Sequence, residues 1–104
     1  MPYHIAIAVQ AETIEPISRC LVIATSASPE GHESSYLGVY DLFRLPEKLI
    51  VKYNFVEDEN EWDYPGLKDY NVLVVAEETD RPDFIESLVS GLGILSTVAE
   101  KTKW

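Results

Sequence analysis

Apolar residues recur along the chain in short runs whose spacing separates strands from helices. The run from Tyr3 to Val9 alternates, so we predict a strand there. The segment from Leu49 to Val56 has the most regular alternation and predicts a second strand. Asn71 to Ala76 has no polar alternation, which is typical of a central strand covered on both faces.

A helix is expected from Pro16, because proline suits a first helical turn. Five apolar residues then share one helical face: Ile17, Cys20, Leu21, Ala24 and Ala27. In the competing interpretation, Cys20 to Thr25 is a strand, because three apolar residues follow one another there. We favour the helix.

A second helix is expected after Thr79. Asp80 can cap it, Pro82 fits its first turn, and Asp83 suits the positive end of the helix dipole. Its core face consists of Phe84, Ile85, Leu88 and Val89. Gly91 should end it, and Ile94 to Ala99 is either a last strand or a continuation of the helix.

The stretches between these elements are rich in turn-forming residues. Ser28 to Ser34 is predicted to be a loop. Tyr36 to Leu45 can be helix or strand; as a strand it places Leu37, Val39, Phe43 and Leu45 on one face, where Asp41 does not fit. A turn around Pro46 would then make a hairpin with the strand from Leu49, and Tyr64 to Leu67 is expected to form a type II turn.

The order of these elements predicts a single α+β domain over residues 1–104. We expect an antiparallel or mixed sheet with two helices on one face, and a ferredoxin-like βαββαβ core with an extra strand is the leading topology. The 104 residues include 46% hydrophobic and 25% charged residues, enough to bury a core. One cysteine, Cys20, excludes an internal disulfide. With no basic leader and no apolar run near ~20 residues, we expect a soluble, cytoplasmic protein.

The charge balance restricts the kind of partner. Eighteen acidic against eight basic residues give a net charge of −10. This opposes direct binding to nucleic acid or to an anionic membrane and favours a basic protein surface. Acidity that serves solubility alone gives the same composition, as it would in a structural or regulatory subunit. The oligomeric state is left open, with a homodimer among the options.

Known catalytic and metal-binding patterns do not account for this chain. His4 and His32 lack a recognised ligand spacing, and a calcium loop starting at Asp58 would need glycine where Asp63 stands. Cys20 is expected to pack in the core, and neighbouring acids such as Glu77 and Glu78 match no motif for acid–base catalysis. We therefore expect no cofactor, no metal and no catalytic residue.

One alternative is enzymatic. The stretch Pro2-Tyr3-His4-Ile5-Ala6-Ile7 resembles the start of the tautomerase superfamily. That resemblance implies an exposed N-terminal amine on Pro2 acting as the base, which requires removal of Met1. A set of arginines near the proline would also be needed, and the chain has Arg19, Arg44 and Arg81 at scattered positions.

The strongest local signal is an acidic stretch between two predicted strands. It contains a tryptophan and is followed by a tyrosine, residue types that protein interfaces favour. We predict that a basic protein partner binds here, as with an immunity protein, an inhibitor or an adaptor. The predicted partner-binding residues are Glu57, Asp58, Glu59, Glu61, Trp62, Asp63 and Tyr64.

Overall fold

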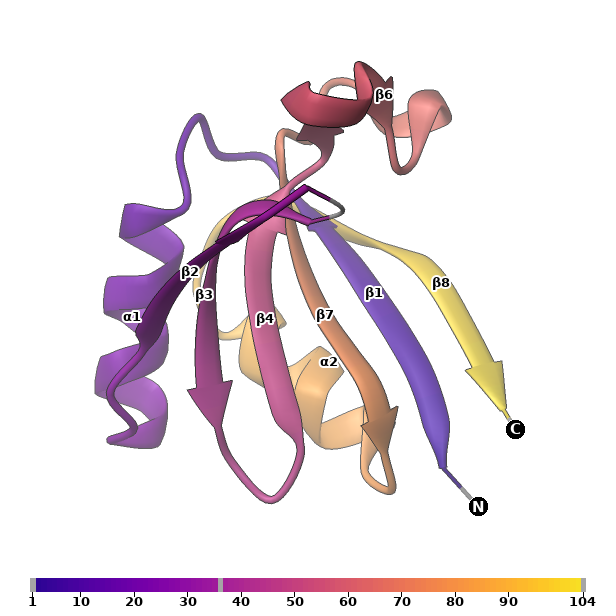
Figure 1. Cartoon of the computed structure of the whole chain (residues 1–104). Coiled ribbons are helices and arrows are strands. Elements are labelled where there is room, and N and C mark those ends of the chain that lie inside the picture. The colour runs from indigo at the N-terminus through magenta and orange to yellow at the C-terminus, as the bar shows by residue number, and fades with distance from the viewer. Residues whose placement is uncertain (1, 36, 104) are drawn as a thin grey trace.

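In the computed structural model, which describes residues 2–35 and 37–103, two helices cover one face of a six-stranded antiparallel sheet (Figure 1). The sheet has the order β2-β3-β4-β7-β1-β8. Its strands are β1 (Tyr3–Val9), β2 (Glu30–Ser34), β3 (Gly38–Arg44), β4 (Lys48–Tyr53), β7 (Val72–Thr79) and β8 (Ser96–Lys103). The helices are α1 (Glu15–Thr25) and α2 (Pro82–Ser90). Between β4 and β7 lie a small hairpin, β5 (Phe55–Val56) with β6 (Glu61–Trp62), and the 3₁₀ helices η1 (Glu57–Glu59) and η2 (Pro65–Leu67).

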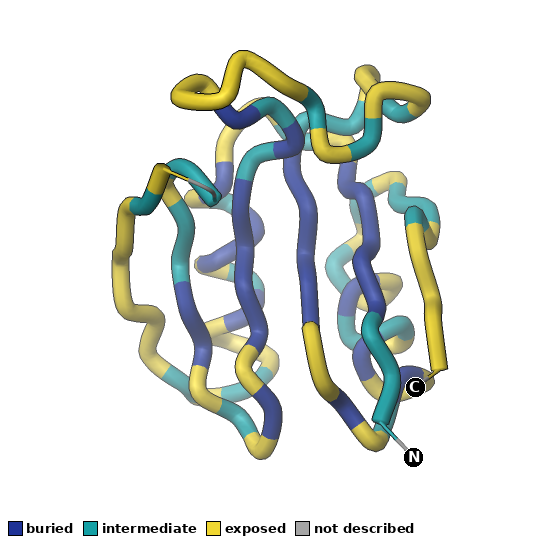
Figure 2. Tube along the Cα trace, turned by 45° about the vertical axis from the view of Figure 1, so that its right-hand side comes forward, coloured by how far each residue is buried: buried dark blue, intermediate teal, exposed yellow. Residues whose placement is uncertain are grey.

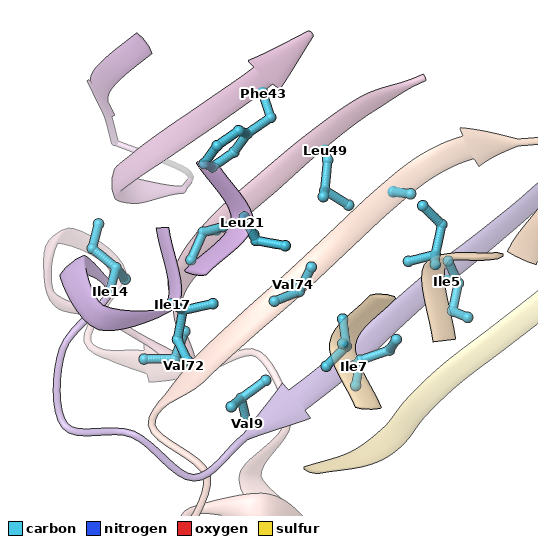
Figure 3. Close-up of a cluster of buried hydrophobic side chains, with 14 residues drawn as sticks. Ile5, Ile7, Val9, Ile14, Ile17, Leu21, Phe43, Leu49, Val72 and Val74 are labelled. Carbon is cyan, nitrogen blue, oxygen red and sulfur yellow. The ribbon is translucent and has the colours of Figure 1, made fainter. Parts of the chain in front are cut away.

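The larger core lies between the sheet and the helices. Alternate residues of the central strands point to this side because successive side chains of a strand face opposite ways. Figure 3 shows Ile17 and Leu21 of α1 beside Val72, Val74 and Phe43 of the strands. The other buried members are Ile5, Ile7, Val9, Ile14, Leu49, Val51, Ala76, Ile85 and Val89.

The opposite sheet face carries a smaller apolar cluster. It contains Ala6, Ala8, Leu42, Ile50, Leu73 and Val75. Tyr64, Leu67 and Tyr70, which follow the small hairpin, pack against this cluster. Because β7 therefore buries side chains on both faces, it needs no polar alternation, and the prediction of a central strand is confirmed (Figure 2).

The first strand and the first helix are confirmed, and the rival strand at Cys20 to Thr25 is wrong. Helix α1 ends at Thr25. Ser26 caps it: its N–H donates to the Val22 oxygen at 2.8 Å, and its left-handed backbone (φ 60°) turns the chain out of the helix. Ile17 and Leu21 are buried, whereas Ala24 is exposed. The buried face of the helix is therefore narrower than its apolar spacing indicated.

The loop predicted at Ser28 to Ser34 is wrong, because most of it forms β2. This strand lies at the sheet edge and pairs only with β3, so its side chains are largely exposed and show no apolar pattern. Stacking of His32 on Tyr40 at 5.3 Å and an ion pair between Glu30 and Arg44 support the pairing.

The hairpin predicted after it is confirmed for the described residues; Tyr36 lies outside them. Strand β3 pairs with β4, with Phe43 opposite Leu49. Asp41 does point to the helix side, where Ser18 Oγ donates a hydrogen bond to its Oδ2 at 2.6 Å. That bond gives the carboxylate a partner on an otherwise apolar face.

Helix α2 begins later than expected. Its N-cap position is Arg81, and Asp80 makes no cap; Thr79 Oγ1 instead accepts the Arg81 N–H at 3.1 Å. Phe84 is not in the core but 40% exposed, with the Arg81 guanidinium 4.0 Å from its ring centre. The chain leaves the helix at Gly91, turns through Gly93 (φ 74°) and enters β8.

Neither helix in the described ranges is long and apolar enough to cross a membrane.

Two finer expectations need correction. Residues 64–67 turn as a 3₁₀ helix in which Leu67 N donates to Tyr64 O at 2.9 Å, and Gly66 lacks the positive φ of a type II turn. The four-stranded ferredoxin-like order is not confirmed, because β2 and β3 extend the sheet to six strands.

Candidate functional site

The predicted partner-binding residues lie in one ordered segment at the end of the sheet where β4 ends and β7 begins (Figure 1). Phe55 pairs with Trp62 and Val56 with Glu61, so β5 and β6 form a short hairpin. At its turn Asn60 adopts a left-handed backbone (φ 52°), a conformation that asparagine tolerates. The acidic stretch is therefore a hairpin rather than an irregular loop. We call residues 57–63 the acidic hairpin.

A buried asparagine fixes the chain that follows the acidic hairpin. The Nδ2 of Asn54, a residue with no exposed surface, donates to the carbonyl oxygens of Tyr64 (3.3 Å), Leu67 (3.1 Å) and Tyr70 (3.1 Å). Its Oδ1 accepts the Tyr64 N–H at 2.9 Å, and its backbone oxygen accepts the Asp63 N–H at 2.8 Å. Sequence reasoning missed this role. Little in the sequence signals it, because Asn54 falls on the same face of the alternating segment as Lys52, where a polar residue is expected.

A buried lysine holds the end of the hairpin. Lys52 is 2% exposed, and its ammonium group forms an ion pair and hydrogen bond with Asp63. A buried ammonium needs such a partner, because removing it from water is costly. Asp63 thus has a role inside the domain. Lys52 was not singled out from the sequence, since a lysine at a polar position of an alternating strand is normally solvent-facing.

Tyr64 connects the segment to the far edge of the sheet. Its hydroxyl donates to Glu100 Oε1 at 2.7 Å, and His4 Nε2 lies 3.8 Å from the same oxygen. Burial and the Glu100 carboxylate raise the pKa of Tyr64 far above its usual value, so the phenol stays protonated. The Tyr64 hydrogen bond in turn lowers the pKa of Glu100. This contact ties residue 64 to β8.

Trp62 is half-buried rather than freely projecting. It meets Phe55 edge-on, with the ring centres 5.2 Å apart, and the Lys68 ammonium lies 5.7 Å from its ring centre. These contacts fix its orientation on the hairpin. The part of the indole that remains exposed can contact a partner.

The remaining predicted residues form the exposed acidic surface of the hairpin (Figure 2): Glu57, Asp58, Glu59 and Glu61. Within the described residues none of these four carboxylates makes an ion pair, whereas Glu30, Glu47 and Glu86 each pair with an arginine or a lysine. Their negative potential is therefore not neutralised locally. The structure brings all seven predicted residues into one segment, four facing solvent and three anchored to the domain.

A hollow of about 380 Å³ lies beside the acidic hairpin. It is lined by Glu33, Gly38, Val39, Tyr53, Phe55, Glu57, Asp58 and Asn71. Two residues of the acidic hairpin thus share a cavity with aromatic and apolar walls. Sequence reasoning missed Glu33, which belongs to the strand mistaken for a loop.

A second polar cluster lies at the opposite end of the sheet. Arg81 binds the nearly buried Glu47 through two hydrogen bonds of 2.9 and 2.8 Å, and Thr79 Oγ1 donates a third at 2.7 Å. Principally because of Arg81, the pKa of Glu47 falls to about 2. The exposed acids Glu77 and Glu78 line a hollow of about 550 Å³ here, together with both partners of the pair. The two acidic clusters are therefore far apart.

The residues considered for catalysis or metal binding do not converge. In the part of the chain that is described, no three His, Cys, Asp or Glu side chains come together around a metal-sized site. Arg44 is paired with Glu30, Arg81 with Glu47, and Arg19 lies exposed on α1. Pro2 lies half-buried just before β1.

Neither a scan against protein-family models nor a search of curated proteins finds a match to this chain.

Proposed function

We propose that this chain is a non-catalytic interaction protein that binds a basic protein partner through the acidic hairpin, in the manner of an immunity protein, an inhibitor or an adaptor. The observation that supports it most is the exposed set Glu57, Asp58, Glu59 and Glu61, whose carboxylates make no ion pair in the described part of the molecule. Charges of one sign held together attract an oppositely charged surface and speed its encounter.

Preorganisation also supports a binding role. A flexible acidic loop would lose conformational entropy when a partner ordered it. Here the Asn54 hydrogen bonds and the Lys52–Asp63 ion pair already hold the hairpin in one conformation. Less of the interaction energy is then spent on ordering the loop.

The experiment is a comparison of tagged variants of this chain in pull-downs from the source cell. One variant carries Glu57→Lys, Glu59→Lys and Glu61→Lys; each change adds two positive charges, so the formal net charge rises from −10 to −4. The control reverses Glu77, Glu78 and Asp80, three exposed acids at the opposite end, with the same change in net charge. We expect the first variant to lose basic partners and the control to keep them. Equal capture of basic partners by the wild type, the hairpin variant and the control would contradict the proposal.

Two structural and cellular inferences accompany it. We infer a ferredoxin-like core made of β8-β1-β7-β4, with β2 and β3 as additions; the antiparallel order of these four strands and the helices after β1 and β7 support this. A single cysteine supports a cytoplasmic location.

A further inference from the structure

The hollow beside the acidic hairpin combines three kinds of wall. Tyr53 and Phe55 supply aromatic rings, and Val39, which is 49% exposed, supplies an apolar side chain. Glu57 and Asp58 add carboxylates. The volume of about 380 Å³ is within the range of small ligand sites.

The charge of the lining selects a cation. Glu33 comes from β2, whereas Glu57 and Asp58 come from η1, so carboxylates approach from two separate segments. Among the described residues, the lining contains no lysine, arginine or histidine. An anion would therefore be repelled, and a neutral group would gain nothing from the charges.

An asparagine provides a further acceptor. Asn71 Nδ2 donates to the Glu12 carbonyl oxygen at 2.7 Å, which fixes the orientation of the amide. Its Oδ1 accepts no hydrogen bond from the described residues, and Asn71 lines both this hollow and a neighbouring one beside Glu12. A ligand with several N–H groups can use this oxygen together with the carboxylates.

We propose that this hollow is a pocket for an arginine side chain of the basic partner. The inference rests on the proposed function and deepens it. A guanidinium is planar, stacks on aromatic rings and donates to carboxylates through two parallel hydrogen bonds. Its three-carbon stem can lie against Val39 and Phe55. Lysine has a compact and strongly hydrated ammonium, which stacks less well on the rings and cannot form two parallel hydrogen bonds to a carboxylate.

The larger hollow at the other end of the sheet lacks this selectivity. Its lining includes Lys48 and Arg81, so cations and carboxylates are mixed. The Glu47 carboxylate there is already occupied by Arg81. The hollow beside the acidic hairpin is thus the cation-selective one of this pair.

The first test is an NMR titration of the full chain with N-acetyl-arginine-N-methylamide, a blocked arginine. We expect amide shifts to concentrate around the hollow, at Val39, Tyr53, Phe55, Asp58 and Asn71. The matching citrulline compound, which has the same shape without the charge, should cause no comparable shifts, and blocked lysine should bind about threefold more weakly. Equal binding of citrulline, or equal binding of lysine and arginine, would overturn the assignment.

The second test separates the pocket from the general acidity of this end of the sheet. Glu57→Gln or Asp58→Asn should weaken binding of the blocked arginine about two- to fivefold, as expected for a partly solvated ion pair. Val39→Trp should block it by filling the hollow. The matched controls Glu12→Gln and Asp69→Asn remove the same charge from exposed residues at the same end of the sheet but outside the lining, and they should leave binding unchanged. If the controls weaken binding as much, the pocket assignment is wrong.

These outcomes differ from those for the proposed function. If blocked arginine does not bind the hollow but the triple reversal still abolishes partner capture, the pocket is refuted and the function stands. If the triple reversal does not change partner capture, the proposed function is refuted. The claim that the pocket holds an arginine of that partner is then refuted as well.

Discussion

At the scale of single residues, the ion pair between Lys52 and Asp63 has an asymmetry that mutation can reveal. Lys52 is 2% exposed, whereas the Asp63 side chain is 38% exposed. Removing the Asp63 side chain leaves the buried Lys52 ammonium without a partner, whereas removing the lysine charge leaves a carboxylate that water can solvate.

We therefore expect Asp63→Ala to lower the free energy of unfolding by about 3 kcal/mol and Lys52→Met to lower it by less than about 1 kcal/mol. Methionine keeps the apolar stem of the lysine packed. Urea unfolding followed by circular dichroism measures both. Equal losses for the two variants would show that Lys52 is not buried as described.

Glu47 gives a residue-scale prediction for pH. Its pKa in the folded protein is about 2, against an ordinary value of 4.5, so the pair with Arg81 stabilises the fold fully above pH 4.5. This contribution, up to about 3 kcal/mol, is lost as the pH falls from 4.5 toward 2.

Glu47→Gln should therefore lower stability at pH 6 and flatten the pH dependence between 4.5 and 2. Urea unfolding at several pH values measures this, with Glu78→Gln, an exposed acid at the same end, as the control. A slope equal to that of the wild type would contradict the role of Glu47.

At the scale of elements, apolar periodicity predicted the strands that pack in the core. It missed the edge strand and the segment that polar contacts hold in place. Strands β1, β4 and β7 could be predicted because their buried faces determine their sequences. Strand β2 could not, since an exposed edge strand needs only backbone pairing with β3. In the candidate site, the exposed acids could be recognised from composition. Asn54 could not, because its role depends on carbonyl groups up to 16 residues away.

Asn54 should control the order of the acidic hairpin. Asn54→Ala removes four hydrogen bonds and leaves buried backbone groups unpaired, so we expect a loss of about 2–4 kcal/mol and faster hydrogen exchange over residues 57–70. Asn60→Gly is the matched control, because glycine accepts the left-handed backbone at that turn. Unchanged exchange in Asn54→Ala would mean that the hairpin is ordered by other contacts.

The central strand β7 provides the corresponding test of the sheet. Val74 has no exposed surface and faces the helices, so Val74→Asp would bury an unpaired charge and should cost several kcal/mol. Thermal unfolding measures the loss. Melting at the wild-type temperature would contradict the position of β7.

At the scale of the whole molecule, unpaired negative charge gathers at both ends of the sheet. The end with the acidic hairpin adds a hollow with aromatic walls, and none of the described residues that line this hollow is basic. The net charge of −10 attracts any basic protein over a distance set by salt, about 8–10 Å at physiological ionic strength. Specific binding should depend on which end is changed, not on the total charge.

The most direct measurement is the association rate constant of the captured basic partner, followed by biolayer interferometry from low to high salt. We expect the association rate constant of the wild type to fall steeply as the salt concentration rises. Reversal of Glu57, Glu59 and Glu61 should slow association and flatten this dependence, whereas reversal of Glu77, Glu78 and Asp80 should largely preserve both. If the two triple variants show the same rates at every salt concentration, only net charge matters, and the claim that the acidic hairpin is the binding site is contradicted.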